Sequence, residues 1–369
     1  MSEYREESDA LDADLLRIIH AWHKHGTALD DAAFNHLALR IFAYQLRYNG
    51  PYAQYCASLG ITTHSLPARW EAIPAVPTTA FKDVPLTTFD PSLAFLAFET
   101  SGTTLGRGGT HYMEKPLLYD AALLAGFDRF MLADSAALRY FNVVPNPVER
   151  AQSSLGYMMA NVSAYRGDAH TGWYVQGEAL LTHAFRTDLQ AAIEASQPVC
   201  IAGTAFGLLG LMDAFDQRPE RFALPPGSRI METGGFKGRT RTVSRTELYE
   251  KLTDRFGVDA TSIVAEYGMT ELTSQYYDSK ASRNESRRIK AAPPWLRTRI
   301  VDVAGESVGN GIVGALVHYD LANRSSVLAV STEDLGASAG EGFVLLGRDA
   351  NANLRGWSLD AEDLQHTHG

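Results

Sequence analysis

Apolar side chains recur at helical spacing near the start of the chain. Within residues 9–25 they lie three or four positions apart, from Leu11 to Trp22, and Gly26 ends the pattern. Residues 31–49 repeat the same spacing. An apolar stripe of this kind predicts an amphipathic helix that packs against a core. The pattern therefore predicts two N-terminal helices, and neither carries a recognisable reactive group.

Short apolar runs alternate with helical patterns over the middle of the chain. The runs have the length of buried strands and comprise residues 93–100, 138–145, 198–203, 228–233 and 262–268. Helical patterns lie between them, and the one over residues 244–257 opens with a capping box, Ser244 with Glu247, and ends at Gly257. Such alternation predicts a parallel sheet with helices on both faces, whose ligands bind at the carboxyl ends of the strands.

The pattern changes after about residue 295, where short alternating stretches separated by turns predict a β-rich subdomain. GNGIVG (309–314) in this region matches the dinucleotide-binding fingerprint letter for letter. That fingerprint requires a helix after it, whereas a strand pattern follows here. We therefore interpret GNGIVG as a turn between two strands.

These patterns predict an α/β fold in four consecutive parts. We expect a helical N-terminal region packed on the core (1–72), an α/β core (73–290), a β-rich subdomain (291–347) and a C-terminal remainder (348–369).

Composition narrows the class of protein. The net charge of −10 disfavours nucleic-acid binding, because an acidic surface repels phosphate backbones. The two cysteines, Cys56 and Cys200, cannot form a disulfide framework and fit a reducing compartment. The N-terminus lacks a signal core, and no apolar run approaches the ~20 residues of a membrane span. We expect a soluble cytoplasmic protein that binds neither nucleic acid nor membranes.

TSGTTLGRGGTH (100–111) follows a predicted strand and is rich in glycine and hydroxyl groups. It is not a Walker A loop, since no lysine follows the glycines. Its glycines would let backbone N–H groups approach a phosphate closely, and its hydroxyls would add donors. Arg107 supplies a permanent cation that can fork onto phosphate oxygens. Taken alone, the segment fits a flexible surface loop equally well.

Two further polar segments follow predicted strands. In EYGMTE (266–271), Glu271 beside Thr270 offers the hard oxygen ligands that Mg²⁺ prefers, and Tyr267 offers a flat face for a base. In STEDLGA (331–337), Asp334 could accept the hydroxyl protons of a ribose. Ordinary polar strand ends would explain each segment separately.

Taken together and in this order, TSGTT, EYGMTE, STEDLG and GRDANANLRGWSL resemble the adenylate-forming superfamily over about residues 70–360. Within it the chain resembles the acyl-protein synthetase (LuxE-like) and phenylacetate–CoA ligase branch. Its length and style also resemble the adenylating protein of phenazine antibiotic biosynthesis (EhpF-like). The resemblance implies that a carboxylic acid reacts with ATP to give an acyl adenylate and pyrophosphate, with Mg²⁺ as the metal.

The resemblance also implies roles for individual residues. Residues 100–104 would cradle the β- and γ-phosphates, Tyr267 would stack on adenine, Asp334 would bind the ribose, and Glu271 would hold Mg²⁺. The implied ATP-binding set is Thr100, Ser101, Gly102, Thr103, Thr104, Gly234, Gly235, Tyr267, Gly268, Met269 and Asp334. The implied catalytic set is Arg107, Thr270, Glu271 and Arg348.

The acid would bind between residues 142–162 and 203–210. The expected pocket residues are Phe141, Tyr157, Met158, Phe206 and Gly207, which favour a flat or apolar acid. The resemblance implies an aromatic acid, such as a phenazine carboxylate. Each of them is equally compatible with an ordinary core position.

The sequence also departs from the superfamily pattern. Only 21 residues follow Arg348, and the last lysine is Lys290, so we expect the small C-terminal domain and its catalytic lysine to be missing. Adenylation would then rely on Arg107, Lys115 or Arg348. The C-terminal cysteine of the luminescence acyl-protein synthetases is also absent, so the acyl group would pass to a partner such as a reductase.

Two other functions stay open from the sequence. One is a non-catalytic nucleotide- or ligand-binding partner in a reductase complex, and the other is an aryl- or acyl-CoA ligase. The identity of the acid, the final acceptor and the oligomeric state are not determined, and a homodimer is compatible with the sequence.

Overall fold

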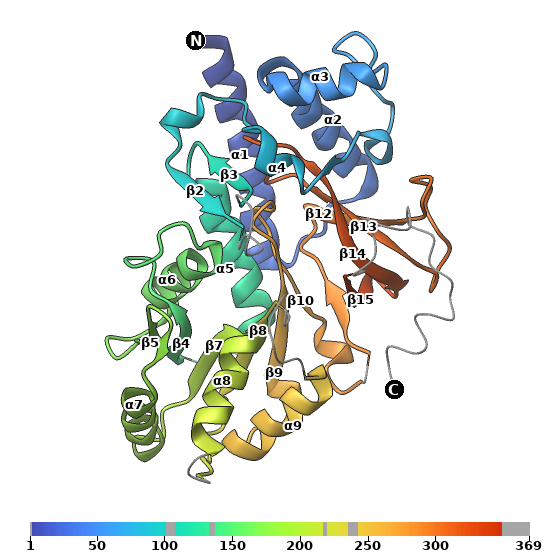
Figure 1. The fold of residues 1–369 in the computed structure, drawn as a ribbon. Helices are drawn as coiled ribbons and strands as arrows, with labels where there is room; N and C mark the ends of the chain where they lie inside the picture. The colour runs from blue at the N-terminus through green and yellow to red at the C-terminus, as the bar shows by residue number, and fades with distance from the viewer. Residues whose placement is uncertain are drawn as a thin grey trace.

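One mixed β-sheet runs through the protein, with helices packed against it (Figure 1). The structure is a computed structural model and describes residues 2–100, 108–132, 137–216, 220–234, 243–285 and 287–348. Among these residues no helix is both long enough and apolar enough to cross a membrane.

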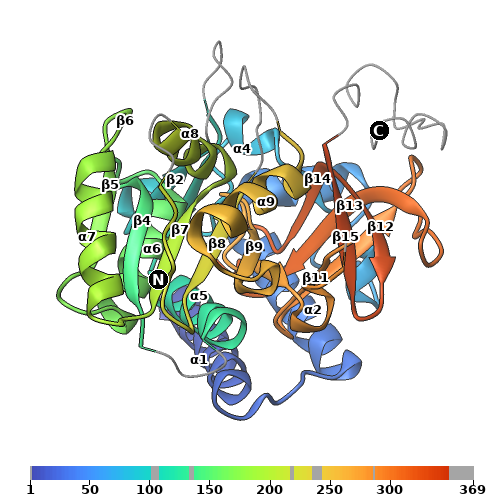
Figure 2. The ribbon, with the colours of Figure 1, turned by 90° about the horizontal axis from the view of Figure 1, so that it is seen from below.

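Parallel strands form the central part of the sheet. In spatial order they are β5 (Gly172–Gln176), β4 (Arg139–Pro145), β7 (Val199–Thr204), β8 (Arg229–Thr233) and β9 (Ile263–Tyr267), with β6 (Ala179–Leu180) antiparallel at the edge. One face is covered by α5 (Leu117–Met131) and α6 (Ser154–Arg166). The other is covered by α7 (Thr182–Glu194), α8 (Ala205–Asp216) and α9 (Arg245–Phe256) (Figure 2). The predicted α/β architecture is therefore confirmed.

Local sequence signals set the ends of α9 as expected. The Ser244 hydroxyl accepts a hydrogen bond from the backbone N–H of Glu247 at 3.1 Å. Gly257 ends the helix with a φ of 62°, a left-handed conformation that glycine adopts without steric cost.

The strand predicted at residues 93–100 does not join the parallel sheet. Its ordered part, β2 (Leu96–Glu99), pairs antiparallel with β3 (Thr110–Met113) in a separate two-stranded sheet. A partner strand this close along the chain closes a local hairpin, whereas a parallel pairing needs a long crossover. The expectation of a buried parallel strand here was wrong, and Phe98 is the one buried side chain of β2.

Antiparallel strands extend the sheet beyond β9. They are β10 (Tyr276–Asp278), β11 (Ile289–Ala291), β15 (Gly342–Arg348), β14 (Ala329–Ala339), β13 (Val313–Asp320) and β12 (Leu296–Val301), in spatial order. GNGIVG connects β12 to β13, and Gly311 has a φ of 74°, which confirms the predicted turn. The β-rich region is thus hydrogen-bonded to the α/β region as one continuous sheet.

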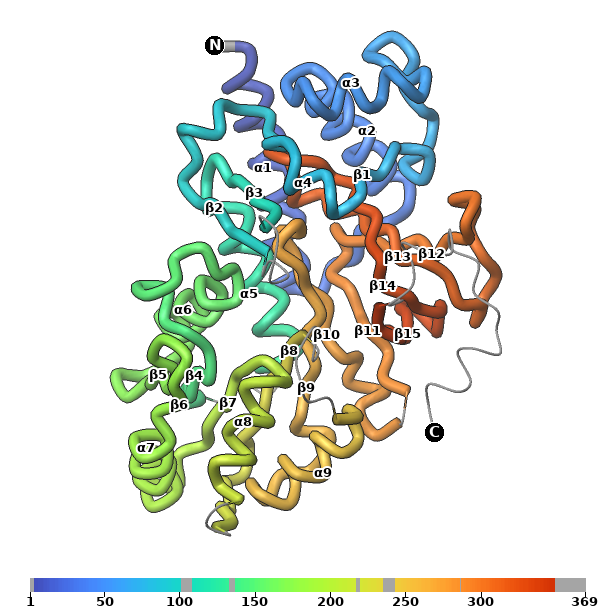
Figure 3. Tube along the Cα trace, in the orientation of Figure 1, coloured from blue at the N-terminus to red at the C-terminus, as the bar shows by residue number. Residues whose placement is uncertain are grey.

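The N-terminal region, up to residue 83, packs on the β-rich end of the sheet. It comprises α1 (Ser2–His25), α2 (Asp31–Tyr48), α3 (Gly50–Ser58), β1 (Val76–Pro77) and α4 (Ala80–Asp83). Short 3₁₀ turns lie at Trp70–Ala72, Pro91–Leu93, Ala260–Ser262 and Lys280–Ser282. Trp22 of α1 meets Trp295 edge to face at 5.3 Å between ring centroids. β1 pairs parallel with β14, which reaches back to the N-terminal region (Figure 3).

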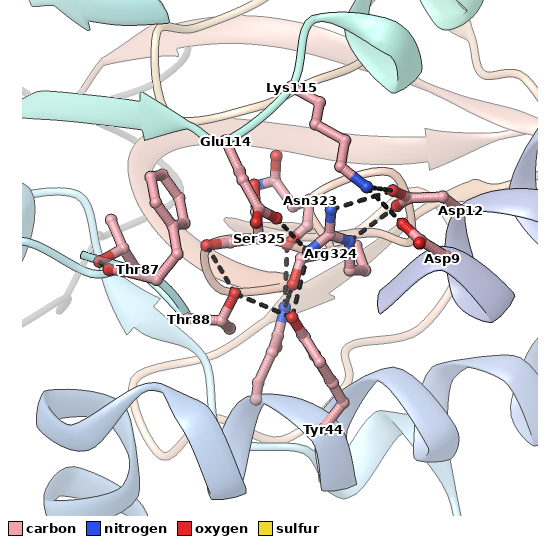
Figure 4. Close-up of polar contacts among 12 residues, drawn as sticks. Asp9, Asp12, Tyr44, Thr87, Thr88, Glu114, Lys115, Asn323, Arg324 and Ser325 are labelled. Carbon is pink, nitrogen blue, oxygen red and sulfur yellow. Dashed lines mark hydrogen bonds and ion pairs between the residues drawn. The ribbon is translucent and has the colours of Figure 1, made fainter. Parts of the chain in front are cut away.

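A buried ion-pair network fastens these helices to the connection between β13 and β14 (Figure 4). Arg324 is only 2% exposed and bonds both carboxyl oxygens of Asp12, at 2.8 and 3.1 Å. It also donates to Glu114 and to the Tyr44 hydroxyl, each at 3.1 Å. Lys115 adds bonds to Asp12 and to an exposed aspartate of α1. One guanidinium therefore joins α1, α2 and the end of β3.

Arg324→Ala is expected to lower the free energy of unfolding by about 3–5 kcal/mol, because the buried Asp12 loses the guanidinium that bonds both its carboxyl oxygens and keeps only Lys115. Chemical denaturation measures this loss. Arg17→Ala is the matched control, since the Arg17–Asp14 pair is largely exposed and is expected to contribute about 0–1 kcal/mol. Equal losses in the two variants would contradict a dominant role for the buried pair.

Candidate functional site

The carboxyl ends of β7, β8 and β9 lie side by side at one edge of the sheet. Thr204 pairs with Thr233, and Thr233 pairs with Glu266. Ligands of open α/β sheets bind at such an edge. EYGMTE leaves β9 here, and Gly234 leaves β8 here with a φ of 71°. The sequence-predicted segments thus begin at the expected edge.

The base of TSGTTLGRGGTH is held against EYGMTE. The backbone N–H of Thr100 bonds the carbonyl of Gly109 at 2.9 Å, and the N–H of Gly109 bonds the Thr100 hydroxyl at 2.8 Å. Two residues further on, Nδ1 of His111 lies 2.8 Å from the carbonyl oxygen of Thr270. The structure therefore brings two segments together that are about 160 residues apart. Ser101, Gly102, Thr103, Thr104 and Arg107 lie outside the described residues.

His111 is a residue that the sequence reasoning did not single out. A carbonyl can only accept, so Nδ1 of His111 carries the proton and donates it to Thr270. Burial lowers the pKa of His111 to about 4. The ring is therefore neutral at pH 7 and acts as a fixed donor. The one signal for His111 in the sequence was its position at the end of the glycine- and hydroxyl-rich stretch 100–111.

Tyr267, Asp334 and Arg348 form a hydrogen-bonded chain across β9, β14 and β15. The Tyr267 hydroxyl donates to one carboxyl oxygen of Asp334 at 2.8 Å, and Nε of Arg348 donates to the other at 3.0 Å. The sequence reasoning assigned all three to the nucleotide site but did not predict that they bond one another. Each carboxylate oxygen still has further acceptor capacity, so ribose binding by Asp334 stays a prediction that these bonds permit.

The ring of Tyr267 is enclosed by aromatic neighbours. It lies 5.7 Å from Tyr276, 5.7 Å from His318 and 6.0 Å from Phe343, and it is 8% exposed. Burial lowers the pKa of His318 to about 4, so this ring is also neutral. Stacking of Tyr267 on adenine stays a prediction. Gly268, Met269 and Thr270 beside it are more accessible, and Gly235 lies outside the described residues.

The segment that carries Glu271 is positioned by the connection after β13. Asn323 donates to the carbonyl of Glu271 at 2.8 Å. The carboxylate of Asp320 accepts from the backbone N–H groups of Thr273 and Ser274, at 3.0 and 2.7 Å. Burial raises the pKa of Asp320 to about 6. The backbone of residues 271–274 is therefore held in place by two buried side chains, Asp320 and Asn323.

The residues around Glu271 suit Mg²⁺, which needs few protein ligands, better than a metal ion that is held entirely by protein side chains. Within the described ranges no group of three or more His, Cys, Asp or Glu could hold a metal ion. Mg²⁺ is commonly held by one or two carboxylates together with the phosphates of its substrate. The buried carboxylate of Glu271, in the turn that follows β9, has this chemistry.

The five predicted acid-pocket residues are not brought together. Phe141 stacks on Tyr174 at 5.2 Å in the core on the α7–α9 face. Tyr157 and Met158 lie on α6 over the opposite face. Phe206 and Gly207 begin α8, and Phe206 is exposed. Because successive residues of a strand point to opposite faces, Phe141 of β4 cannot share a pocket with α6.

The remaining candidate groups lie away from this edge. Lys115 bonds Asp9 at 2.6 Å and Asp12 at 3.2 Å within the network of Figure 4. Burial raises the pKa of Cys56 to about 11 and that of Cys200 to about 12, so both thiols stay protonated at neutral pH. A groove of about 440 Å³ beside β12 and β15 contains none of the predicted site residues.

Glu266 is a second residue that the sequence reasoning passed over. The Thr233 hydroxyl donates to its carboxylate, and burial raises the pKa of Glu266 to about 7. A Cβ at Gly268 would lie 2.4 Å from Oε1 of Glu266, so glycine is required there while the carboxylate keeps its place. An acid at the end of an apolar strand was the available signal.

Glu266→Gln is expected to stabilise the protein in a pH-dependent way. Since the folded pKa is about 7 and the ordinary value is 4.5, the folded state binds more protons between these values. Stability contributed by Glu266 therefore falls as pH rises through that window. Glutamine stays neutral, so the variant should gain about 3 kcal/mol at pH 8 and about 1 kcal/mol at pH 5. Urea denaturation at both pH values checks this.

Glu250→Gln on the exposed face of α9 is the control and should gain nothing at either pH. A gain by Glu266→Gln that is the same at pH 5 and pH 8 would contradict a raised pKa.

Comparisons with known proteins agree with this geometry at the level of fold. An open conformation of 2-hydroxyisobutyryl-CoA ligase, crystallised with 2-HIB-AMP and CoA, has a TM-score of 0.64 at 14% identity and covers 86% of this chain and 74% of its own. The same ligase in its postadenylation state also scores 0.64, at 15% identity, covering 86% and 67%. A comparison with curated protein sequences found no match.

A match to a protein-family model identifies the family, which similarity of fold alone does not. The model described as acyl-protein synthetase, LuxE, matches residues 25–359, which is most of the chain. The match spans the loop at 100–111, EYGMTE, Asp334 and Arg348. The chain therefore belongs to the LuxE acyl-protein synthetase family, whose members activate acyl groups as adenylates.

Proposed function

We propose that the protein adenylates an aromatic carboxylic acid with ATP and passes the activated acyl group to a partner protein, such as a reductase. The observation that carries the proposal is the bond from His111 to the carbonyl of Thr270. It holds the base of a glycine- and hydroxyl-rich loop against a segment that offers an aromatic ring and a carboxylate. A nucleoside triphosphate needs both within one site: the loop for its phosphates, and the ring and the carboxylate for its base and its Mg²⁺.

The reaction joins two anions, so the site must position them and offset their charge. The carboxylate oxygen of the acid attacks the α-phosphorus of ATP, and the bond to pyrophosphate breaks. In the proposal, Thr100–Thr104 and Arg107 bind the phosphates and Thr270 contacts the α-phosphate. Asp334 and Arg348 lie beside the ribose. Glu271 would hold Mg²⁺, which supplies positive charge to the phosphate oxygens when bound.

The acyl acceptor is proposed to be external to the described part of the chain. Cys56 and Cys200 are both buried and protonated at neutral pH, so neither suits acyl transfer. For the acid, we propose an aromatic carboxylate, with a phenazine carboxylate as the first candidate to test. The aromatic pair of Tyr119 on α5 and Tyr157 on α6, with ring centroids 5.7 Å apart, supports a flat substrate.

Exchange of labelled pyrophosphate into ATP tests the activity, with each acid of an aryl and fatty-acyl panel added in turn. Wild-type protein should show acid-dependent exchange. Arg107→Ala should reduce it by at least ~10²-fold, because a charged donor to the phosphates is lost. Glu271→Gln should reduce it similarly and shift the Mg²⁺ dependence to higher concentration. Glu250→Gln, on the exposed surface of α9, is the matched control.

Two outcomes would redirect the proposal. ATP binding without exchange for any acid, unchanged in Glu271→Gln, would favour a non-catalytic nucleotide-binding partner. Exchange followed by acyl-CoA formation when CoA is added would favour a CoA ligase over transfer to a protein.

A further inference from the structure

His318 on β13 is a fully buried histidine that packs among three aromatic rings. The ring centroids of Tyr267, Tyr276 and Phe343 lie 5.7, 5.1 and 6.2 Å from its own. A phenylalanine would fill such a space without polar atoms to satisfy, whereas a buried polar group costs free energy unless it is hydrogen-bonded. The hydrogen bonds of His318 must therefore explain why a histidine occupies this position.

Both ring nitrogens of His318 have hydroxyl partners. Nε2 lies 3.1 Å from the hydroxyl oxygen of Tyr267. Nδ1 lies 2.8 Å from the hydroxyl of Tyr276 and 3.1 Å from that of Thr298. The hydroxyls of Tyr276 and Thr298 are themselves 2.7 Å apart. The imidazole ring thus connects β10 and β12 on one side to β9 on the other.

The carboxylate of Asp334 determines which atom donates in each of these bonds. The Tyr267 hydroxyl has one proton and donates it to Asp334 at 2.8 Å, so its oxygen can only accept from His318. Nε2 of His318 therefore carries a proton. Burial lowers the pKa of His318 to about 4, so the ring is neutral at pH 7 and Nδ1 is an acceptor. Tyr276, the nearer of the two hydroxyls, donates to Nδ1.

The result is a series of donors that ends at Asp334. Tyr276 donates to His318, His318 donates to Tyr267, and Tyr267 donates to one oxygen of Asp334, while Arg348 bonds the other at 3.0 Å. Because an N–H group faces one side of the Tyr267 oxygen, the hydroxyl proton is directed to the other side, toward the carboxylate. Both oxygens of Asp334 are then held, and their remaining lone pairs have fixed directions.

We propose that His318 is a positioning residue of the nucleotide site: its Nε2–H group directs the Tyr267 hydroxyl onto Asp334 and so orients the carboxylate that accepts the ribose hydroxyls of ATP. This inference rests on the proposed adenylation activity and adds a residue that does not itself contact the nucleotide. Asp334 is 4% exposed, so water contributes little to its orientation and the protein donors decide it.

Equilibrium binding of ATP and of 2′,3′-dideoxy-ATP to the full chain, measured by isothermal titration calorimetry, tests the proposal. The two nucleotides differ only in the ribose hydroxyls. The wild type should bind ATP at least ~10-fold more tightly, because the analogue leaves a buried charged acceptor without its donors. His318→Asn should lower this ratio at least ~3-fold and leave the affinity for the analogue within about twofold, whereas a general structural defect would weaken both nucleotides alike.

His318→Gln is the matched variant. The side-chain amide of glutamine reaches the position of Nε2, whereas that of asparagine ends at the position of Nδ1. Glutamine can therefore restore the donor to Tyr267 and should keep the ratio within about twofold of the wild type. Phe343→Leu is the packing control, since it loosens the contact with the same ring and leaves these hydrogen bonds in place. It should keep the ratio as well.

A double-mutant cycle with Tyr267→Phe adds a second readout. Tyr267→Phe removes the next bond of the series and should lower the ratio as His318→Asn does. The double variant should show no further loss, because both changes interrupt one series of bonds. If His318→Asn does not fold, as judged by its melting transition, His318→Phe takes its place with the same expectation, since it keeps an aromatic ring and lacks the N–H group.

The outcomes separate this inference from the proposed function. An unchanged ratio in the variant that lacks the donor, an equal loss in His318→Gln or Phe343→Leu, or additive losses in the double variant would overturn the role of His318 and leave the adenylation activity standing. A wild type that binds both nucleotides equally would do the same. Absence of pyrophosphate exchange with every acid overturns the proposed function instead, because nucleotide binding is measured without an acid. A chain that does not bind ATP overturns both.

Discussion

Buried charge in the connection between β13 and β14 couples the two ends of the molecule. Arg324 in this connection bonds α1 and α2, while Asp320 and Asn323, only a few residues away, hold the backbone of the segment after EYGMTE. Charges this deeply buried tolerate little displacement, since each must keep its partner to offset the loss of water. The N-terminal helices and the candidate nucleotide segment are therefore positioned by one short stretch of chain.

The candidate site depends on this coupling because its parts come from distant regions of the sequence. The loop at 100–111 belongs to a local hairpin, EYGMTE to the parallel sheet, and Asp334 and Arg348 to the antiparallel extension. A neutral histidine joins the first two, and the Tyr267–Asp334–Arg348 chain joins the last two. Membership of the LuxE family gives this arrangement its chemical context, the activation of acyl groups as adenylates.

The two faces of the parallel sheet differ at the edge where the site forms. On the α7–α9 face, Glu232 is engaged by Tyr249, so that carboxylate already has a protein partner. On the α5–α6 face, Glu266 and Tyr277 are register partners. Among the described residues Glu266 accepts one hydrogen bond, from Thr233, and the Tyr277 hydroxyl has no partner. Buried polar groups that lack hydrogen-bond partners cost free energy, so the two faces differ in how well the fold satisfies their polar side chains.

The sequence by itself determined most elements of the fold. Apolar periodicity identified α1 and α2, the parallel strands from β4 to β9 and the change to antiparallel strands after residue 295, because burial on one or both faces imposes a period on the chain. Motif order also predicted roles for the segments around Thr270 and Asp334, and these roles stay predictions. Only the tertiary structure decided which face each side chain joined: it separated Phe141 from Tyr157, placed β2 in a hairpin, and aligned Glu266 with Thr233 and Tyr277. Periodicity records that a side chain is buried, whereas its neighbours across the sheet are set by register and strand order, which no local pattern encodes.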